Sequence, residues 1–143
     1  MKLRPAQATD QETIVAIIHE ADINPRDLDW RRFLIAEEDG LVVGIGQIKL
    51  HGDGSRELAS LAVIPSRRGQ GIGSEIIRAL LAKESGTLYL TCRAQLEPYY
   101  TRFGFHRIER NEMTPYFRRL MRVARFLLPI FARGVQIIIM KKG

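Results

Sequence analysis

Hydrophobic and polar residues follow a helical period near the start of the chain. Apolar residues stand three and four positions apart, the spacing of a helix that buries one face; they are Ile14, Ile17, Ile18 and Ala21. Thr9 or Asp10 can cap the start of this helix, because a short polar side chain accepts from the first free amides. Asn24-Pro25 interrupts the pattern, and the polar stretch 25–32 is expected to form a second short helix.

Short apolar runs bounded by turn residues predict strands along the rest of the chain. These runs cover residues 1–8, 33–37, 41–50, 56–64, 87–92, 105–109 and 135–140. Glu38-Asp39-Gly40 predicts a hairpin, and helical patterns are expected over 71–84 and 95–103. The element order indicates a mixed α/β (α+β) fold, with a central, mostly antiparallel sheet of about six to seven strands flanked by helices. We expect one domain over residues 1–143.

A basic, glycine-rich turn joins the strand 56–64 to the helix 71–84. It reads Pro65-Ser66-Arg67-Arg68-Gly69-Gln70-Gly71-Ile72-Gly73-Ser74. Glycine lets the backbone approach a ligand closely, and the first amides of a helix lack intrahelical acceptors, so a phosphate or pyrophosphate fits such a turn. The dinucleotide pattern G-x-G-x-x-G and the nucleotide-triphosphate ending G-K-[ST] are both absent. The alternative is an ordinary glycine-rich loop.

The hexapeptide Arg68-Gly69-Gln70-Gly71-Ile72-Gly73 resembles motif A of the GNAT superfamily of N-acetyltransferases, in a bacterial-type single domain. The resemblance implies that acetyl-CoA is the acyl donor and that the turn, with Ser74, holds its pyrophosphate. It also implies a V-shaped splay of the sheet beside the strand 56–64. The pantetheine arm would pair there with backbone groups of Leu61, Ala62 and Val63, although apolar residues in a strand are also simply core.

A second segment, Tyr99-Tyr100-Thr101-Arg102-Phe103-Gly104-Phe105, resembles the Y-x-x-x-G-F element of the same family. By this resemblance Tyr100 is the general acid that protonates the departing thiolate; alternatively it is a buried aromatic that anchors a helix. Tyr99 is the weaker candidate. Arg93 stands where the family often has an asparagine, and it would instead pair with a phosphate or face the substrate.

The general base is less sharply indicated. Glu57 lies six residues before Val63, a spacing that resembles the glutamate of the histone-acetylating branch of the family. Strand alternation would put residues 57, 59, 61 and 63 on one face. The alternative for Glu57 is a solvated charge at the start of a strand, and His51 and Glu97 are lesser candidates. Direct attack by an amine needs no thiol, so Cys92 is interpreted as a small buried strand residue.

Composition adds few constraints. The chain has 143 residues, 45% of them hydrophobic, and one cysteine. A single cysteine cannot form an internal disulfide, which fits a reducing, cytoplasmic environment. The sequence shows no metal-ligand spacing, so we expect no metal. It also shows no signal peptide and no membrane-spanning run.

Positive charge is concentrated near the C-terminus. Residues 101–143 contain 10 of the 22 Lys/Arg and 2 of the 16 Asp/Glu residues. Residues 111–133 form a basic amphipathic insertion before the last strand, with a helix start at Thr114-Pro115 and an end or kink at Pro129. Its apolar stripe is predicted to be Phe117, Leu120, Met121, Ala124, Leu127, Leu128 and Phe131, with Arg118, Arg122 and Arg125 off the stripe.

Three interpretations of this insertion stay open. It can pack on the sheet or on a second subunit as a homodimer contact. Segment 115–133 can also lie on an anionic membrane surface, or bind an acidic substrate or nucleic acid.

The sequence thus predicts an N-acetyltransferase that moves an acetyl group from acetyl-CoA to a primary amine by direct attack in a ternary complex. The acceptor is a small molecule or a peptide: polyamine, aminoglycoside, amino acid, and protein N-terminus or lysine all remain open. The alternatives are a non-catalytic CoA-binding sensor or interaction module, and a peripheral membrane or nucleic-acid binder acting through the basic helix.

Overall fold

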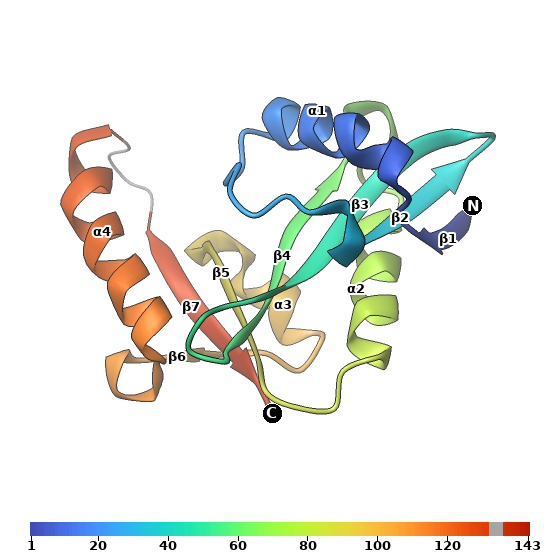
Figure 1. Ribbon diagram of the computed structural model, residues 1–143. Helices are drawn as coiled ribbons and strands as arrows, with labels where there is room; N and C mark the ends of the chain where they lie inside the picture. The colour runs from blue at the N-terminus through green and yellow to red at the C-terminus, as the bar shows by residue number, and fades with distance from the viewer. Residues whose placement is uncertain (132–135) are drawn as a thin grey trace. The chain divides into compact units, whose positions relative to one another are not determined.

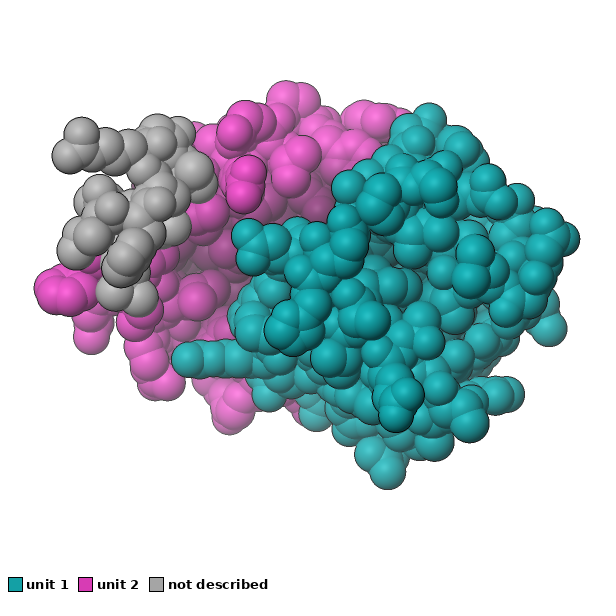
Figure 2. Space-filling model, turned by 90° about the horizontal axis from the view of Figure 1, so that it is seen from above, with its two compact units in different colours: residues 1–49, 58–85 teal, residues 50–57, 86–143 magenta. Residues whose placement is uncertain are grey.

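The computed structural model (Figure 1) describes the backbone of residues 1–131 and 136–143 and the side chains of residues 1–126 and 136–143. The chain divides into two compact units. Unit 1 comprises residues 1–49 and 58–85, and unit 2 comprises residues 50–57 and 86–143 (Figure 2). The expectation of a single domain over 1–143 stays a prediction.

Unit 1 holds the N-terminal strands and two helices. They are β1 (Lys2–Pro5), α1 (Gln11–Ala21), β2 (Phe33–Glu38), β3 (Leu41–Leu50), β4 (Arg56–Val63) and α2 (Ile72–Ala82), with 3-10 turns at Ala8–Asp10, Trp30–Arg32 and Pro65–Arg67. The last residue of β3, Leu50, and the first two of β4, Arg56 and Glu57, belong to unit 2. The strand order is β1-β2-β3-β4, and the β1–β2 and β2–β3 pairs are antiparallel. The predicted hairpin is therefore confirmed.

The two helices of unit 1 cover opposite faces of these strands, because neighbouring residues of a strand point to opposite sides. The apolar stripe of α1 packs on Ile35 and Ile45, which pair across β2 and β3. On the other face, a Cβ built on Gly46 would lie 2.8 Å from Ile76 Cγ2 of α2. Glycine at this position therefore lets α2, whose first turn borders the glycine-rich turn, lie directly on the sheet.

Unit 2 begins with the turn between β3 and β4 and contains the C-terminal elements. These are β5 (Leu88–Arg93), α3 (Glu97–Thr101), β6 (His106–Ile108), α4 (Pro115–Phe131) and β7 (Ile137–Lys142), with 3-10 turns at Ala94–Leu96 and Arg110–Glu112. The strand order is β4-β5-β7-β6. Glu57 of β4 is in register with Tyr89 of β5 in a parallel pair, whereas β7 is antiparallel to β5 and β6. The predicted fold class, with its seven-stranded, mostly antiparallel sheet, is confirmed.

Helix α4 packs by its first turns on the strands of unit 2. Phe117 is fully buried in a cluster with Tyr89, Ile108 and Ile139, one residue from each of β5, β6 and β7. The predicted apolar stripe is confirmed for Phe117, Leu120 and Met121. Ala124 is half-buried and its place in the stripe stays a prediction, while the side chains of Leu127, Leu128 and Phe131 lie outside the described residues.

One local prediction was wrong, and a second was wrong in part. The stretch 25–32 forms no α-helix, only the turn Trp30–Arg32. Side-chain amides hold its backbone instead: Gln47 Nε2 donates to the Asp27 carbonyl, and Gln11 Oε1 accepts from the Trp30 amide. Helix α4 continues through Pro129 to Phe131, so the proline does not end the helix there, and the alternative of a kink at Pro129 stays a prediction. Residues 132 and 133 of the predicted insertion lie outside the described residues.

Candidate acyl-transfer site

The glycine-rich turn has the geometry of an open anion cradle. Gly69 and Gly71 have positive φ angles of 79° and 82°, and Gly71 is the N-cap of α2. A Cβ built on either residue would meet no atom within 4 Å, so the backbone faces open space on that side. Ile72 is buried and anchors the first turn of α2, whose leading amides have no intrahelical acceptors. The turn can therefore accept an anionic group against backbone N–H donors and the positive end of the helix dipole.

Arg68, predicted to lie in this cradle, is held by unit 1 itself. Its Nε donates to the Val63 carbonyl at 3.0 Å, and its terminal nitrogen lies 3.0 Å from Oε2 of Glu20 on α1. Arg67 is 3.5 Å from Glu38. The two arginines thus fix the turn to β4, α1 and β2 while adding positive charge beside it.

The sequence did not indicate the backbone irregularity in β4. Ser60 has a φ of 55° in the middle of the strand, a region that favours glycine. Its hydroxyl accepts from Nε2 of Gln47, a fully buried residue of β3. The polar Gln47 within an apolar run was the available signal. Because this φ interrupts the regular backbone of β4 between Ala59 and Leu61, the shared face of residues 57, 59, 61 and 63 stays a prediction.

Unit 2 brings two predicted candidates together. Nε2 of His51 lies 2.7 Å from Oε1 of Glu57, and both residues are buried. An ionised Glu57 carboxylate can only accept this hydrogen bond, and in that state Nε2 of His51 is the donor. The alternative of a solvated Glu57 was wrong, since β3 and β4 place its side chain inside unit 2 beside the imidazole. This pair can receive or deliver a proton, although its catalytic role stays a prediction.

The first turn of α4 covers this pair, a contact that the sequence did not reveal. The Tyr116 ring stacks on the His51 ring at 3.5 Å between centroids, and Phe117 meets His51 edge-on. The Tyr116 amide donates to Oδ2 of Asp53, in the turn between β3 and β4. Burial alone would raise the pKa of Asp53, but hydrogen bonds from Ser55 and from the Tyr116 amide lower it below its ordinary value. Asp53 therefore stays ionised and holds α4 in place.

Tyr100 lies near the end of α3, half-buried, with its ring edge-on to Phe105. Burial raises the pKa of its phenol, so the hydroxyl keeps its proton well into the alkaline range. Tyr99 stacks edge-on against Tyr100. Cys92 is buried in β5, as predicted, and burial raises the pKa of its thiol to about 11, which makes it a poor nucleophile at neutral pH.

The other candidates lie apart from this pair. Arg93 ends β5 with an exposed side chain, and Glu97 is 3.9 Å from Arg107. Among the described residues, no group of His, Cys, Asp and Glu could hold a metal ion. Within the same residues, no helix has the length and apolar character needed to cross a membrane.

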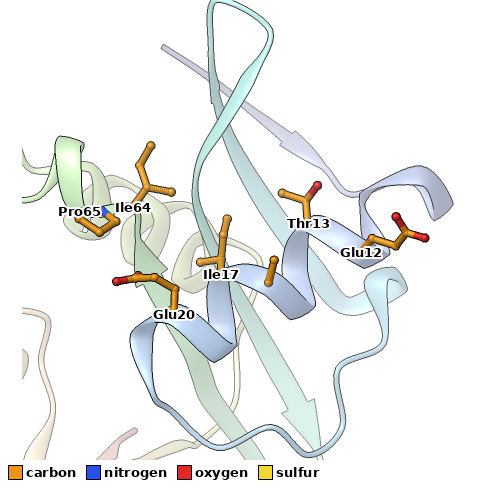
Figure 3. Close-up of a pocket in the computed structure, with 7 residues that line it drawn as sticks. Glu12, Thr13, Ile17, Glu20, Ile64 and Pro65 are labelled. Carbon is orange, nitrogen blue, oxygen red and sulfur yellow. The ribbon is translucent and has the colours of Figure 1, made fainter.

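An open pocket of about 450 Å³ lies in unit 1 between α1 and the end of β4. In Figure 3, the lining residues Glu12, Thr13, Ile17 and Glu20 come from α1, and Ile64 and Pro65 come from the segment that precedes the cradle. Its walls contain none of the predicted site residues. The ion pair of Glu20 with Arg68 nevertheless links this pocket to the cradle.

Residues 29–107 match the family model of the acetyltransferase (GNAT) domain. The chain belongs to the GNAT family. The matched segment includes the cradle, the His51–Glu57 pair and Tyr100. The resemblance that the sequence motifs suggested is therefore confirmed.

Curated relatives match only part of this GNAT chain. The mycothiol acetyltransferase of Nocardia farcinica is 33% identical over 78 residues, which are 54% of this chain and 25% of that protein. The mycothiol acetyltransferase of Mycolicibacterium vanbaalenii is 36% identical over 67 residues, 47% of this chain and 22% of that protein. The matched regions thus make up about a quarter of each relative's length.

Solved structures resemble the GNAT chain over nearly all of its length. N-acetylglutamate synthase from Neisseria gonorrhoeae, complexed with coenzyme A and N-acetyl-glutamate, has a TM-score of 0.77 and 20% identity, covering 99% of this chain and 34% of that one. Rv2747 from Mycobacterium tuberculosis, in complex with CoA, has a TM-score of 0.75 and 23% identity, covering 99% and 98%. At these identities the likeness establishes the fold.

Proposed function

We propose that this chain is an acetyl-CoA-dependent N-acetyltransferase that acetylates a primary amine. The observation that carries the proposal is the open cradle at Gly69 and Gly71, directly before α2, in a chain with a GNAT domain. Structural neighbours complexed with coenzyme A support the same donor.

The cradle supplies the donor site in this proposal. Backbone amides of Gly69, Gly71 and the first turn of α2 hold the pyrophosphate, with Gln70, Ile72, Gly73 and Ser74 completing the turn. Arg68 adds positive charge beside the cradle, and its side chain is held by hydrogen bonds to the Val63 carbonyl and the Glu20 carboxylate. The pantetheine arm pairs with backbone groups of Leu61, Ala62 and Val63. The positive φ of Ser60 supports this role, because such an irregularity releases neighbouring backbone groups from the ladder.

The acyl transfer then runs by direct attack. The neutral amine nitrogen forms a bond to the thioester carbonyl carbon, and a backbone N–H near Val63 stabilises the developing negative oxygen. The nitrogen gives its proton to the carboxylate of Glu57, which His51 orients through the 2.7 Å hydrogen bond. The carbon–sulfur bond breaks, and the Tyr100 hydroxyl protonates the departing thiolate. The raised pKa of Tyr100 keeps its hydroxyl protonated at neutral pH, as a general acid must be.

The acceptor is a small molecule or a peptide with a primary amine. The N-acetyl-glutamate bound to one structural neighbour puts amino acids first in an acceptor screen, followed by polyamines, aminoglycosides and peptides with a free N-terminus or lysine. The buried thiol of Cys92 is compatible with a reducing cytoplasm, the compartment we propose.

Thermal melting with and without acetyl-CoA tests the donor site, because a ligand that binds only the folded state raises the melting temperature. We expect a rise for the native chain and none for Gly71→Glu, whose carboxylate would occupy and repel the cradle. Gly40→Glu is the matched control: Gly40 has a φ of 77° and open space around a built Cβ, but it lies in the β2–β3 turn. No shift at saturating acetyl-CoA would refute the proposal.

Acetyl-CoA consumption with the acceptor panel then separates an enzyme from a CoA-binding module. Release of free thiol that depends on the acceptor indicates transfer. A melting shift without turnover on any amine would favour the non-catalytic alternative.

A further inference from the structure

Helix α4 buries one face and exposes another that the acyl-transfer proposal does not use. Phe117, Leu120 and Met121 pack toward the strands of unit 2. The exposed side chains between residues 118 and 126 are Arg118, Arg119, Arg122, Val123, Arg125 and Phe126. The inner face is therefore accounted for by the core of unit 2, and the outer face is both strongly basic and partly apolar.

The apolar residues of this outer face are strongly exposed. Phe126 is 77% exposed and Val123 is 50% exposed. Residues three and four apart are neighbours on a helix, so Arg119 lies beside Val123 and Arg122 lies beside Phe126. Each exposed apolar side chain thus has a guanidinium group next to it. We call these four residues, Arg119, Arg122, Val123 and Phe126, the outer patch.

No carboxylate in the described part of the chain forms an ion pair with Arg119, Arg122 or Arg125. Arg118 is engaged differently, since its Nε donates to the Arg110 carbonyl. Residues 110–126 contain five arginines and one glutamate, Glu112. The complementary surface must therefore be anionic, and it must also have room for a phenyl ring and an isopropyl group.

We propose that the outer patch docks this protein on an anionic phospholipid surface. Guanidinium groups bind lipid phosphates in a bidentate manner, while Phe126 and Val123 enter the boundary between headgroups and acyl chains. A nucleic acid offers phosphates and stacking bases but no apolar phase for the aliphatic Val123. A lipid surface satisfies the arginines and both apolar side chains at once. The inference rests on α4 and is independent of the acyl-transfer chemistry.

Co-sedimentation of the full chain with vesicles tests this proposal. Vesicles of phosphatidylcholine with phosphatidylglycerol are compared with vesicles of phosphatidylcholine alone, at low and at high salt. We expect binding only to the anionic vesicles, weakened by salt, because counterions screen the arginines. Arg119→Gln with Arg122→Gln should weaken binding about fivefold per arginine. Phe126→Ser should weaken it about tenfold, since an inserted aromatic ring leaves water.

Matched substitutions on unit 1 control for net charge and exposure. Arg26→Gln with Arg32→Gln removes two exposed arginines, and Leu41→Ser removes a side chain that is 56% exposed; both should bind vesicles like the native chain. All variants change exposed residues, and unchanged melting verifies that they fold.

Three outcomes would overturn the lipid proposal. The first is no sedimentation with anionic vesicles. The second is sedimentation that the outer-patch variants do not weaken. The third is retention on transfer RNA or on a second copy of the chain that Phe126→Ser abolishes while vesicles stay unbound.

Discussion

His51 and Glu57 form a buried pair, with 2.7 Å between Nε2 and Oε1. The two residues flank the turn between β3 and β4, and the Tyr116 ring at the start of α4 stacks on the imidazole. A carboxylate held in this way has a fixed orientation, which a general base needs. The insertion that contains α4 therefore supports the proposed base as well as presenting the outer patch.

The pair can be tested by substituting each member. Glu57→Gln keeps the shape and a hydrogen-bond acceptor but removes the base, so we expect the rate of acetyl transfer to fall by about 10²–10⁴-fold. His51→Gln should lower the rate less and shift its pH profile, because it disturbs the orientation of the carboxylate. Measuring kcat against pH for both variants and the double variant gives their coupling. Independent, additive effects would show that the two residues do not act together.

Glu109→Gln is the matched control for these rates, since Glu109 is an exposed carboxylate in the same unit. Its rate should equal that of the native chain. A loss as large as that of Glu57→Gln would indicate a general effect of charge.

Tyr100 gives a second prediction, on the acid. Because burial raises its pKa, the proposed acid stays protonated up to and beyond the ordinary tyrosine value of about 10. Acetyl transfer should therefore show no loss assigned to Tyr100 between neutral pH and that value. Tyr100→Phe should lower kcat by about 10²-fold or more with little change in acetyl-CoA affinity. Tyr99→Phe, in the neighbouring position, should keep most of the activity; equal losses in both variants would contradict the assignment.

The local parts of the site could be predicted from sequence, because each depends on a few adjacent residues. Gly69 and Gly71 between a strand and a helix predicted the turn, and both have the positive φ that glycine allows. Asp39-Gly40 likewise predicted the β2–β3 hairpin. Motif spacing located Tyr100 at the end of a short helix, as the structure has it.

The non-local parts could not be predicted in this way. The stacking of Tyr116 on His51 joins residues far apart in the chain, and so does the hydrogen bond from Tyr116 to Asp53. The irregular backbone of Ser60 depends on the buried side chain of Gln47 across the β3–β4 region. For residues 25–32, helical propensity was outweighed by the amides of Gln11 and Gln47, which hold the loop by side-chain hydrogen bonds.

Acid stability provides a third prediction, at Asp10. Arg4 donates to both carboxylate oxygens, at 2.8 and 3.1 Å, and this hydrogen bonding lowers the pKa of Asp10 despite its burial. A lowered pKa means that the contribution to stability is present above the ordinary value of about 3.9 and is lost as the pH falls through the folded-state value. Asp10→Asn should reduce the free energy of unfolding by about 1.5–3 kcal/mol at neutral pH. The variant should also lose less stability than the native chain as the pH falls into the acid range.

Asp39→Asn is the control for Asp10, because Asp39 is an exposed aspartate in the β2–β3 turn of the same unit. Urea unfolding between pH 3 and pH 7 should show little change for this variant. If the free energy of unfolding of Asp10→Asn still falls at acid pH as steeply as that of the native chain, other carboxylates cause the loss.

Phe117 and Phe126 of α4 allow a final prediction, on which face of the helix carries its stability. Phe117 is fully buried against Tyr89 and Ile139, whereas Phe126 is 77% exposed. Phe117→Ala should lower the free energy of unfolding by about 3–5 kcal/mol, because it leaves a cavity in unit 2. Phe126→Ala should change it by no more than about 0.5 kcal/mol. Urea unfolding of both variants measures the difference. A comparable loss at Phe126 would mean that its side chain is packed in the free protein, and the outer patch would then be unavailable to a membrane.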